Sequence, residues 1–257
     1  MLRRHFLPSL ALTGFVVVFL LLYVAVVYAI GQVAFKHNAD GSLITRDGQV
    51  IGSSLIGQSF TDANGNPLPQ YFQPRPSATS PNPYNASASA ASNLGPSDPR
   101  LVGFVPGFNT VGLNGQPSAT NPFATAADPY CVPTDPKGNP VTSPTPGQKY
   151  ARNKDGSYVC DPNTVPERAI AYRQLNDLAA NATVPVDAVT ASASGVDPQI
   201  SIANADLQAP RVARLRHLPL AQVMSVVKKY TSSRSLGFLG EPGVNVLELN
   251  LALDRTG

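Results

Sequence analysis

The start of the chain has its most pronounced hydrophobic pattern. Leu10–Ile30 contains twenty-one consecutive residues without a charged side chain, and it follows closely on Arg3, Arg4 and His5. A helix of this length spans roughly 30 Å, the thickness of the hydrocarbon core of a bilayer. The pattern therefore predicts one transmembrane helix over residues 10–30, with residues 1–9 as a short tail.

A cleaved signal peptide is the alternative interpretation, because such peptides also begin with basic residues and Ala29 offers a small residue for a peptidase. The apolar core of a signal peptide is typically about 7–15 residues, however, and this one is longer. We therefore favour a retained anchor. By the positive-inside rule, Arg3 and Arg4 place the tail in the cytoplasm and the rest of the chain outside it.

The chain changes character in its middle. Ten of the 25 prolines fall within residues 102–162, with many Gly, Asn and Thr residues and no sustained apolar periodicity. Such a stretch buries too little apolar surface to offset its ordering entropy. We therefore expect it to be a surface insertion.

The strand and helix signals on either side of this insertion predict an α+β fold. A single N-terminal transmembrane helix precedes one mixed α/β extracytoplasmic domain, formed by residues 36–101 and 163–257, with residues 102–162 as a Pro/Gly-rich insertion between them.

The first part of this domain begins with a hairpin signal. Ser42–Arg46 is typical of a short strand, Asp47-Gly48 is a two-residue turn, and Gln49–Ile51 begins the return strand. The stretch that follows, up to residue 99, is rich in Ser, Asn, Pro and Gly. This composition predicts an ordered loop rather than regular secondary structure.

Helical signals return in residues 163–257. Thr164 and Glu167 have the spacing of a capping box at the start of a helix. Ser201 is a candidate cap for a second helix, which Pro210 kinks or restarts. A third helix has an apolar face that we expect to pack in the core, consisting of Leu220, Val223, Met224, Val227 and Tyr230.

Two segments of this second part have the composition of strands. They are Val184–Thr190 and the apolar run Val244–Leu251 near the end of the chain. The apolar positions of the second segment switch phase along its length. A β-bulge or burial on both faces would explain that switch.

Charge and cysteine content narrow the classes of function. Outside the tail, 17 basic residues stand against 16 acidic ones, a balance without the electrostatic footprint of a nucleic-acid-binding protein. Cys131 and Cys160 both fall on the exported side, where a disulfide is the simplest interpretation and two unpaired thiols are the alternative. The three histidines are scattered along the chain, so we expect no metal site.

Motifs of the common enzyme classes are missing from the sequence. The chain has no GxxxxGK[ST] phosphate loop and no GxSxG nucleophile elbow. It also lacks DKTGT, the sequence whose aspartate accepts phosphate in P-type ATPases. We therefore expect no catalytic residues and no ATP hydrolysis by this chain alone.

Arg75 is the sharpest single-residue candidate. It lies between Pro74 and Pro76, which hold the backbone stiffly on both sides. Its planar guanidinium, with five donors, suits a fixed hydrogen-bonding partner. The sequence leaves open whether that partner is a carboxylate of the same domain or a group on another protein.

Several separated motifs resemble, in order, the C subunit of the Kdp potassium-transporting ATPase. The resemblance covers essentially the whole chain except about residues 102–162, and we expect that insertion to be absent from the family. The motifs are GSSLIGQSF at 52–60, YFQPRPSAT at 71–79, SNLGPS at 92–97, VPVDAVTASASGVDPQIS at 184–201, Gln208 with Arg211-Val212-Ala213 and Arg216, and GFLGEPGVNVLELNLAL at 237–253.

The resemblance implies a non-catalytic accessory subunit of a high-affinity, ATP-driven potassium importer in the bacterial inner membrane. The implied partners are a channel-like potassium-binding subunit, a P-type ATPase subunit and a very small membrane peptide. The family's C subunit is described as a catalytic chaperone that raises the ATPase subunit's affinity for ATP. No cofactor would then be bound firmly, and ATP would be bound only within the complex.

Candidate site residues follow from the matching motifs. The nucleotide-contact candidates are Thr190, Ser192, Ser194, Gln208 and Arg211, and the interface or structural candidates are Arg75, Pro76, Ser77, Asn93 and Glu241. Direct contact with ATP conflicts with the predicted topology, because ATP is cytoplasmic whereas this domain is expected outside. Without the resemblance, the best alternative is an exported binding module or cell-envelope interaction protein tethered by its N-terminus.

Overall fold

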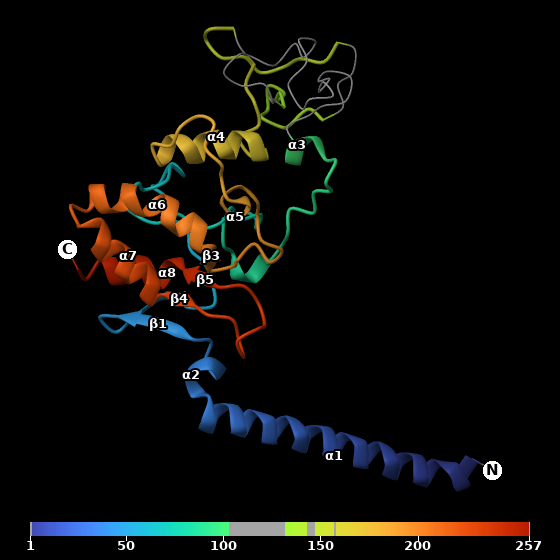
Figure 1. Cartoon of the computed structure of the whole chain (residues 1–257). Coiled ribbons are helices and arrows are strands. Elements are labelled where there is room, and N and C mark those ends of the chain that lie inside the picture. The colour runs from blue at the N-terminus through green and yellow to red at the C-terminus, as the bar shows by residue number, and fades with distance from the viewer. Residues whose placement is uncertain (1, 103–131, 143–146, 157, 257) are drawn as a thin grey trace. The chain divides into compact units, whose positions relative to one another are not determined.

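The computed structural model describes residues 2–102, 132–142, 147–156 and 158–256. The chain divides into two compact units, Met1–Leu55 (unit 1) and Ile56–Gly257 (unit 2). The helices and strands of both units are drawn in Figure 1. Their content of helices and small sheets agrees with the expected α+β class.

Unit 1 begins with the apolar helix α1, Leu2–Ala34, which extends beyond the predicted span on both sides. Within the described residues, α1 is the one helix long and apolar enough to cross a membrane, and His5–Ala34 reaches a mean hydropathy of 2.8. The short helix α2, Lys36–Ala39, follows it. Length and composition of α1 therefore support the predicted membrane span.

The predicted hairpin is confirmed in unit 1. Strand β1, Leu43–Arg46, pairs antiparallel with β2, Gln49–Ser53. Between them, Asp47 and Gly48 have φ angles of 52° and 77°. A two-residue turn needs this left-handed pair to match the twist of its strands, which is why the Asp-Gly dipeptide located it correctly.

Unit 2 is built from short helices around a small antiparallel sheet of order β3-β5-β4. The strands are β3 (Gln199–Ile200), β4 (Thr231–Ser232) and β5 (Gly243–Asn245). The helices are η1 (Ala86–Ala88), α3 (Pro99–Val102), α4 (Val165–Leu175), α5 (Val186–Val189), α6 (Ile202–Leu215), α7 (Leu220–Lys229) and α8 (Val246–Leu253).

The core of unit 2 lies where α6, α7, α8 and β5 come together, the orange and red elements of Figure 1. Val223 and Val227 of α7 are buried in it, and Met224 and Tyr230 pack against it. The predicted core face of this helix is therefore confirmed for these four residues. It is wrong for Leu220, which lies at the first position of α7 and is exposed. The remaining buried members are Phe72, Ile200, Ala205, Ala209, Val212, Ala213, Val244, Val246, Leu249 and Leu253.

Both predicted helix caps are confirmed. The Thr164 hydroxyl accepts a hydrogen bond from the Glu167 N–H at 3.3 Å, at the start of α4. The Ser201 hydroxyl accepts one from the Asn204 N–H at 3.1 Å, at the start of α6. Helix α6 continues through Pro210 without restarting. Each cap satisfies an N–H group that a helix start leaves without an intrahelical partner.

The predicted strand at Val184–Thr190 is wrong, because Val186–Val189 forms the single helical turn α5. The Asp187 carboxylate in this turn accepts hydrogen bonds from the Ser201 N–H and hydroxyl, both at 2.8 Å, and from the Asn204 amide at 3.0 Å. These bonds join α5 to the start of α6. Such a tertiary contact outweighs the strand propensity of valine and threonine.

The predicted strand at Val244–Leu251 is wrong after its first two residues. Strand β5 ends at Asn245, whose side chain caps α8 by accepting a hydrogen bond from the Glu248 N–H at 3.1 Å. The phase switch in the sequence is therefore the change from a strand period of two to a helix period near 3.6. It is not a bulge.

The described part of the segment 102–162 is folded. Val132 and Val141 are buried, and an isolated bridge pairs Thr134 with Pro140. The expectation that this segment buries little apolar surface is therefore wrong for this part of it. For the residues outside the described ranges, it stays a prediction.

One turn motif occurs twice in unit 2 and was not predicted. The sequence Thr-Asp-x-x-Gly-Asn-Pro stands at residues 61–67 and again at 134–140. In both copies, the Asp Oδ1 accepts hydrogen bonds from the N–H groups two and four residues later, at 2.8–2.9 Å. The Asp Oδ2 accepts one from the Asn amide at 3.0 Å. Asp, Asn, Gly and Pro thus close the same tight loop twice.

Candidate functional site

Two buried amides hold the YFQPRP segment at its Phe72–Gln73 step. The Asn250 side chain accepts a hydrogen bond from the Phe72 N–H at 2.9 Å and donates one to the Phe72 carbonyl at 3.0 Å. Gln208 makes the same pair of bonds to Gln73, at 2.7 and 3.0 Å. Each amide therefore replaces the neighbouring strand that an extended backbone would otherwise need.

Arg211 of α6 binds the backbone just before Phe72, at Pro69 and Tyr71. Its side chain is almost fully buried, with an exposed fraction of 2%. Its Nη1 donates hydrogen bonds to the carbonyls of Tyr71, at 3.0 Å, and of Pro69. Its Nε donates to Asn176 Oδ1 and its Nη2 donates to Gln208 Oε1, both at 2.9 Å. Burial lowers the pKa of Arg211 to about 10, so it remains a cation at neutral pH.

Arg216, at the end of α6, completes this polar cluster. Its Nε donates to the Gln70 carbonyl at 2.7 Å, and its Nη2 pairs with Asp254 at 2.9 Å. The guanidinium also lies over the Tyr71 ring, 4.7 Å from its centroid, where a cation is attracted by the ring face. Side chains of α6 and α8 thus fix the whole stretch from residue 69 to residue 73.

Arg75 has its partner within unit 2. Its Nη1 lies 3.3 Å from Asp197 Oδ2, and its Nη2 donates to the Ala191 carbonyl at 3.4 Å. The Tyr84 hydroxyl donates to the Arg75 carbonyl, and burial raises the pKa of Tyr84 above its ordinary value. Of the two possible partners left open by the sequence, the structure contains the internal one.

Ser77 joins this segment to the serine-rich motif at 190–195. Its hydroxyl donates to the Gly195 carbonyl at 2.6 Å and accepts from the Tyr84 N–H at 3.0 Å. Gly195 has a φ of +70°, and a Cβ there would lie 2.5 Å from the Ala90 carbonyl oxygen. Only glycine fits this position, because the two loops approach so closely.

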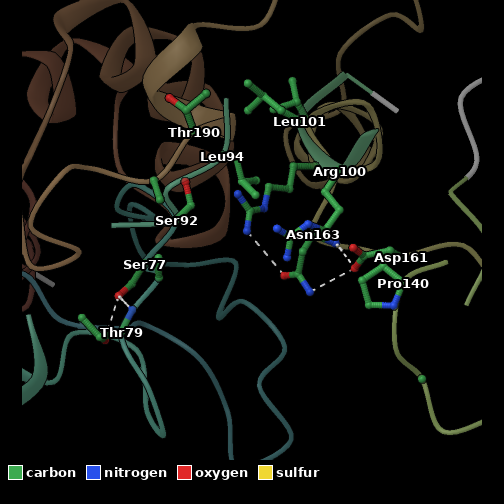
Figure 2. Close-up of a pocket in the computed structure, with 15 residues that line it drawn as sticks. Ser77, Thr79, Ser92, Leu94, Arg100, Leu101, Pro140, Asp161, Asn163 and Thr190 are labelled. Atoms are coloured by element: carbon green, nitrogen blue, oxygen red, sulfur yellow. Dashed lines mark hydrogen bonds between the residues drawn. The ribbon is translucent and has the colours of Figure 1, made fainter. Parts of the chain in front are cut away.

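A cavity of about 380 Å³ lies beside this junction. Figure 2 shows Ser77 and Thr79 on one side of it and Asp161, Asn163 and Pro140 on another. The remaining residues that line the cavity are Ala78, Ser92, Leu94, Arg100, Leu101, Gly138, Val165, Arg168, Thr190 and Ala191.

Charges around this cavity are largely compensated. Arg168 donates to the Val189 carbonyl at 3.2 Å and to Asn163 Oδ1 at 3.4 Å, and burial lowers its pKa. Asp161 lies near enough to oppose that lowering of the pKa. Arg100 is paired with Asp98 at 3.3 Å. The cavity therefore has a mixed polar lining rather than a concentrated positive charge.

The five nucleotide-contact candidates do not form one constellation. Thr190 lines the cavity, and the hydroxyls of Ser192 and Ser194 are 3.5 Å apart in the next turn of the loop. Gln208 and Arg211 instead belong to the buried cluster that holds residues 69–73. Their polar atoms are already engaged with the protein's own backbone and side chains.

The interface candidates are also separated. Arg75, Pro76 and Ser77 lie together in the segment described above, whereas Asn93 is an exposed residue with a φ of 53°. Glu241 is exposed and pairs with Arg234 at 2.7 Å.

The predicted disulfide pair is described at one end only. Cys160 is disulfide-bonded, and Cys131 lies outside the described residues. Among the described residues, no three His, Cys, Asp or Glu side chains gather as metal ligands.

Sequence reasoning missed Asn250 and Asp197, which hold the two ends of the YFQPRP segment. The sequence did contain an indication of Asn250, because it is the one amide in the apolar run VLELNLAL. In the structure this amide is fully buried. A polar side chain at a core position needs a partner. Asp197 carried no such signal, because its pairing with Arg75 depends on a contact between distant segments.

A family model and several known proteins similar to this chain all carry a description of the same subunit. The family model described as "KdpC: K+-transporting ATPase, c chain" matches residues 6–128 and 144–255. Proteins named "Potassium-transporting ATPase KdpC subunit" are 39% identical in Mycobacterium tuberculosis (strain ATCC 25618 / H37Rv), over 99% of this chain and 100% of the relative, and 39% identical in Methylococcus capsulatus, over 98% and 97%. One from Herminiimonas arsenicoxydans is 40% identical over 91% and 88%.

These matches correct the expectation that residues 102–162 are absent from the family. The family model leaves only residues 129–143 unmatched within that segment, and the mycobacterial relative aligns over nearly all of this chain. Together with the ordered motifs along the chain, these matches establish its family. The chain belongs to the KdpC family, the c chain of the K+-transporting ATPase.

Proposed function

We propose that this chain is anchored in the bacterial inner membrane by α1 and holds unit 2 outside the cytoplasm, as a non-catalytic subunit of the potassium-transporting ATPase. The observation that carries the proposal is α1, with its 30-residue apolar stretch His5–Ala34. Arg3 and Arg4 before the stretch support a cytoplasmic N-terminus. The family supports membership of the complex, because the relatives are named as its subunits.

The role in this proposal is assembly and stability of the complex. Unit 2 packs its family motifs against one another, through Asn250, Gln208 and Arg211, which favours a rigid body rather than a reaction site. The proposed partners are the potassium-binding channel-like subunit, the P-type ATPase subunit and the small membrane peptide. Unit 2 would lie over the extracytoplasmic face of the potassium-binding subunit.

The catalytic-chaperone role implied by the resemblance belongs to this proposal in an indirect form. We infer that the chain raises the ATPase subunit's affinity for ATP through contacts between subunits, without holding ATP itself outside the complex. Two of the candidate nucleotide contacts, Gln208 and Arg211, are occupied by the protein's own backbone and side chains. The proposed position of unit 2 outside the cytoplasm also separates it from ATP.

Assembly is tested by copurification of the partner subunits and by growth in potassium-limited medium. Three forms of the chain are compared: the full chain, the chain with residues 5–34 replaced by an unrelated apolar span, and residues 35–257 alone. We expect the full chain to retain the partners and the last form to lose them. Full assembly in cells that lack this chain altogether would contradict the proposal.

Nucleotide titration tests the indirect role. The purified full chain should show no saturable ATP binding, whereas the ATPase of the complete complex should show a lower KM for ATP than a preparation without this chain. Saturable ATP binding by the chain alone, lost in Thr190→Ala, would instead favour direct contact through the 190–195 loop.

A further inference from the structure

The hairpin of unit 1 exposes apolar side chains on one of its two faces. Leu43 and Thr45 lie two residues apart on β1, and Val50 of β2 pairs with Thr45. Side chains two positions apart on a strand, and side chains directly opposite each other in an antiparallel pair, share a face. Leu43 and Val50 have exposed fractions of 46% and 58%. These three residues form the hairpin face, whose apolar area gains free energy by leaving water.

A series of backbone hydrogen bonds connects this hairpin to the end of α1. The Phe35 N–H donates to the Gly31 carbonyl at 2.9 Å. Across α2, the Ala39 N–H donates to the Phe35 carbonyl at 2.8 Å, and the Ser42 N–H donates to the His37 carbonyl at 2.9 Å. Strand β1 begins at the next residue. The hairpin is therefore fixed to the end of α1 within one compact unit, rather than joined to it by a free linker.

Helix α2 brings the chain back beside the last turns of α1, as the blue elements of Figure 1 show. A Cβ on Gly31 would lie 3.8 Å from the Ala39 Cβ, and Gln32 Nε2 donates to Asp40 Oδ1 at 3.2 Å. Lys36 Nζ donates to the other Asp40 oxygen at 2.8 Å, so the charge of this carboxylate is compensated. Residues 39 and 40 thus lie close to residues 31 and 32.

The length of α1 sets the level at which the hairpin begins. Helix α1 has 33 residues and is therefore roughly 50 Å long, whereas a bilayer with its headgroup regions is about 40–45 Å thick. The last turns of a spanning α1 consequently reach the headgroup level. Because residues 39 and 40 lie beside these turns, the hairpin starts at that level as well.

We propose that the hairpin face lies in the interfacial zone of the lipid bilayer, at the end of α1, and that lipid covers Leu43 and Val50. The inference deepens the proposed function, because it rests on α1 as the membrane anchor, and it applies to either orientation of the chain. Val33 and Phe35, with exposed fractions of 87% and 60%, lie at the same level. Apolar and aromatic side chains of this kind bind the boundary between headgroups and acyl chains.

The backbone of the hairpin indicates a shallow position. Strands β1 and β2 form a two-stranded sheet, so each has an edge whose N–H and C=O groups face away from the other strand. Such edges are too costly to place in hydrocarbon, where no water is present to bond them. The interfacial zone supplies water to the edges and acyl chains to the hairpin face. A second contact of this kind would limit the rotation of α1 about its own axis.

A single introduced tryptophan tests this position, because the chain contains none of its own. The full chain carrying Val50→Trp is reconstituted into phosphatidylcholine vesicles whose lipids hold a nitroxide quencher near the headgroup. Gln49→Trp is the matched control, since Gln49 is the neighbouring exposed residue of β2 and points to the opposite face. We expect quenching at position 50 to exceed that at position 49 by about twofold or more.

Leu43→Trp repeats the test on β1 and should be quenched as strongly as Val50→Trp. It decides the matter if tryptophan at position 50 disturbs the β1–β2 pairing. Quenching at position 43 no stronger than at position 49 would overturn the inference.

The complete complex separates lipid from a protein occupant. We expect the stronger quenching at position 50 to persist there, and its loss would overturn the inference by showing that a partner subunit covers the hairpin face. Washing the vesicles with alkaline carbonate tests the anchor separately. Release of the chain would contradict the proposed function itself, whereas a retained chain with an unquenched tryptophan would overturn the hairpin's position alone.

Discussion

The Asn250 amide lies in an otherwise apolar helix face and bonds both polar groups of the Phe72 backbone. Asn250→Asp keeps the size of the side chain and its acceptor but replaces the donor with an anionic oxygen facing a carbonyl. We expect the free energy of unfolding to fall by about 2–4 kcal/mol, since a buried polar group is left unpaired and a charge is buried. Urea unfolding of the detergent-solubilised chain measures this change.

Gln222→Ala is the control for that substitution, because Gln222 is an exposed amide on α7. Its effect should stay within about 0.5 kcal/mol. Similar urea midpoints for Asn250→Asp and wild type would show that the clamp on Phe72 does not stabilise unit 2.

Arg75 makes its contacts within unit 2, so replacing it should lower the free energy of unfolding of this unit. Its ion pair with Asp197 is partly exposed, with side-chain exposures of 25% and 31%, and we expect Arg75→Ala to cost about 1 kcal/mol. Arg75→Lys should cost nearly as much, because an ammonium cannot reach both Asp197 and the Ala191 carbonyl in the same planar geometry. The melting temperature of each variant measures the effect.

Arg214→Lys offers the matching control, since Arg214 pairs with Asp177 on the exposed surface, where both side chains are more than 60% exposed. It should melt as wild type does. Should Arg75→Lys also melt as wild type does, charge alone would be sufficient at position 75 and the argument from planar geometry would be wrong.

At the scale of elements, the packing of loops against one another depends on glycines that leave no room for a side chain. A Cβ on Gly57 would lie 2.6 Å from the Tyr84 ring and 2.8 Å from the Asp197 carbonyl oxygen. Gly57→Ala should therefore lower the free energy of unfolding by about 1–3 kcal/mol, since the neighbouring loops must move. Chemical unfolding of the two proteins measures the difference.

Gly95→Ala separates this steric effect from a general effect of replacing glycine. A Cβ on Gly95 meets nothing within 4 Å, and its φ is not left-handed. Its stability should be unchanged or slightly raised, because alanine reduces the freedom of the unfolded chain. Equal destabilisation by both substitutions would count against close loop packing at Gly57.

Local signals predicted the elements that depend on local interactions. The Asp47-Gly48 turn and the Thr164 and Ser201 caps are formed by neighbours in sequence, and all three were located correctly. The Val184–Thr190 segment failed because Asp187 bonds residues of α6, which a local pattern does not contain. The Asn245-x-x-Glu248 cap of α8 was readable and was missed.

The candidate site was predictable only as a set of motifs. The sequence indicated Arg75 and Ser77, yet their partners Asp197 and Gly195 lie more than a hundred residues later. Which segments meet is decided by tertiary packing, and no spacing in the sequence encodes it. Gln208 and Arg211 were named as nucleotide-contact candidates from the family resemblance. Their burial depends on tertiary packing, and a polar residue type does not reveal it.

At the scale of the whole molecule, the proposed function depends on which side of the membrane holds unit 2. The apolar stretch of α1 and the two arginines before it favour a cytoplasmic N-terminus and a unit 2 outside the cytoplasm. Reversal of these charges, Arg3→Glu with Arg4→Glu, should weaken the preference for a cytoplasmic N-terminus. Protease accessibility of unit 2 in right-side-out membrane vesicles should then fall relative to wild type. Unaltered accessibility would mean that these arginines do not set the orientation.

A pair of reporters fused after Gly257 tests directly whether unit 2 lies outside the cytoplasm. One is an enzyme active only outside the cytoplasm, and the other is a fluorescent protein that matures only inside it. We expect an active outer reporter and a dark inner one, because the proposed α1 crosses the membrane once with its N-terminus in the cytoplasm. A silent outer reporter with a bright inner one would contradict the proposed topology, since unit 2 would then lie in the cytoplasm, where ATP is.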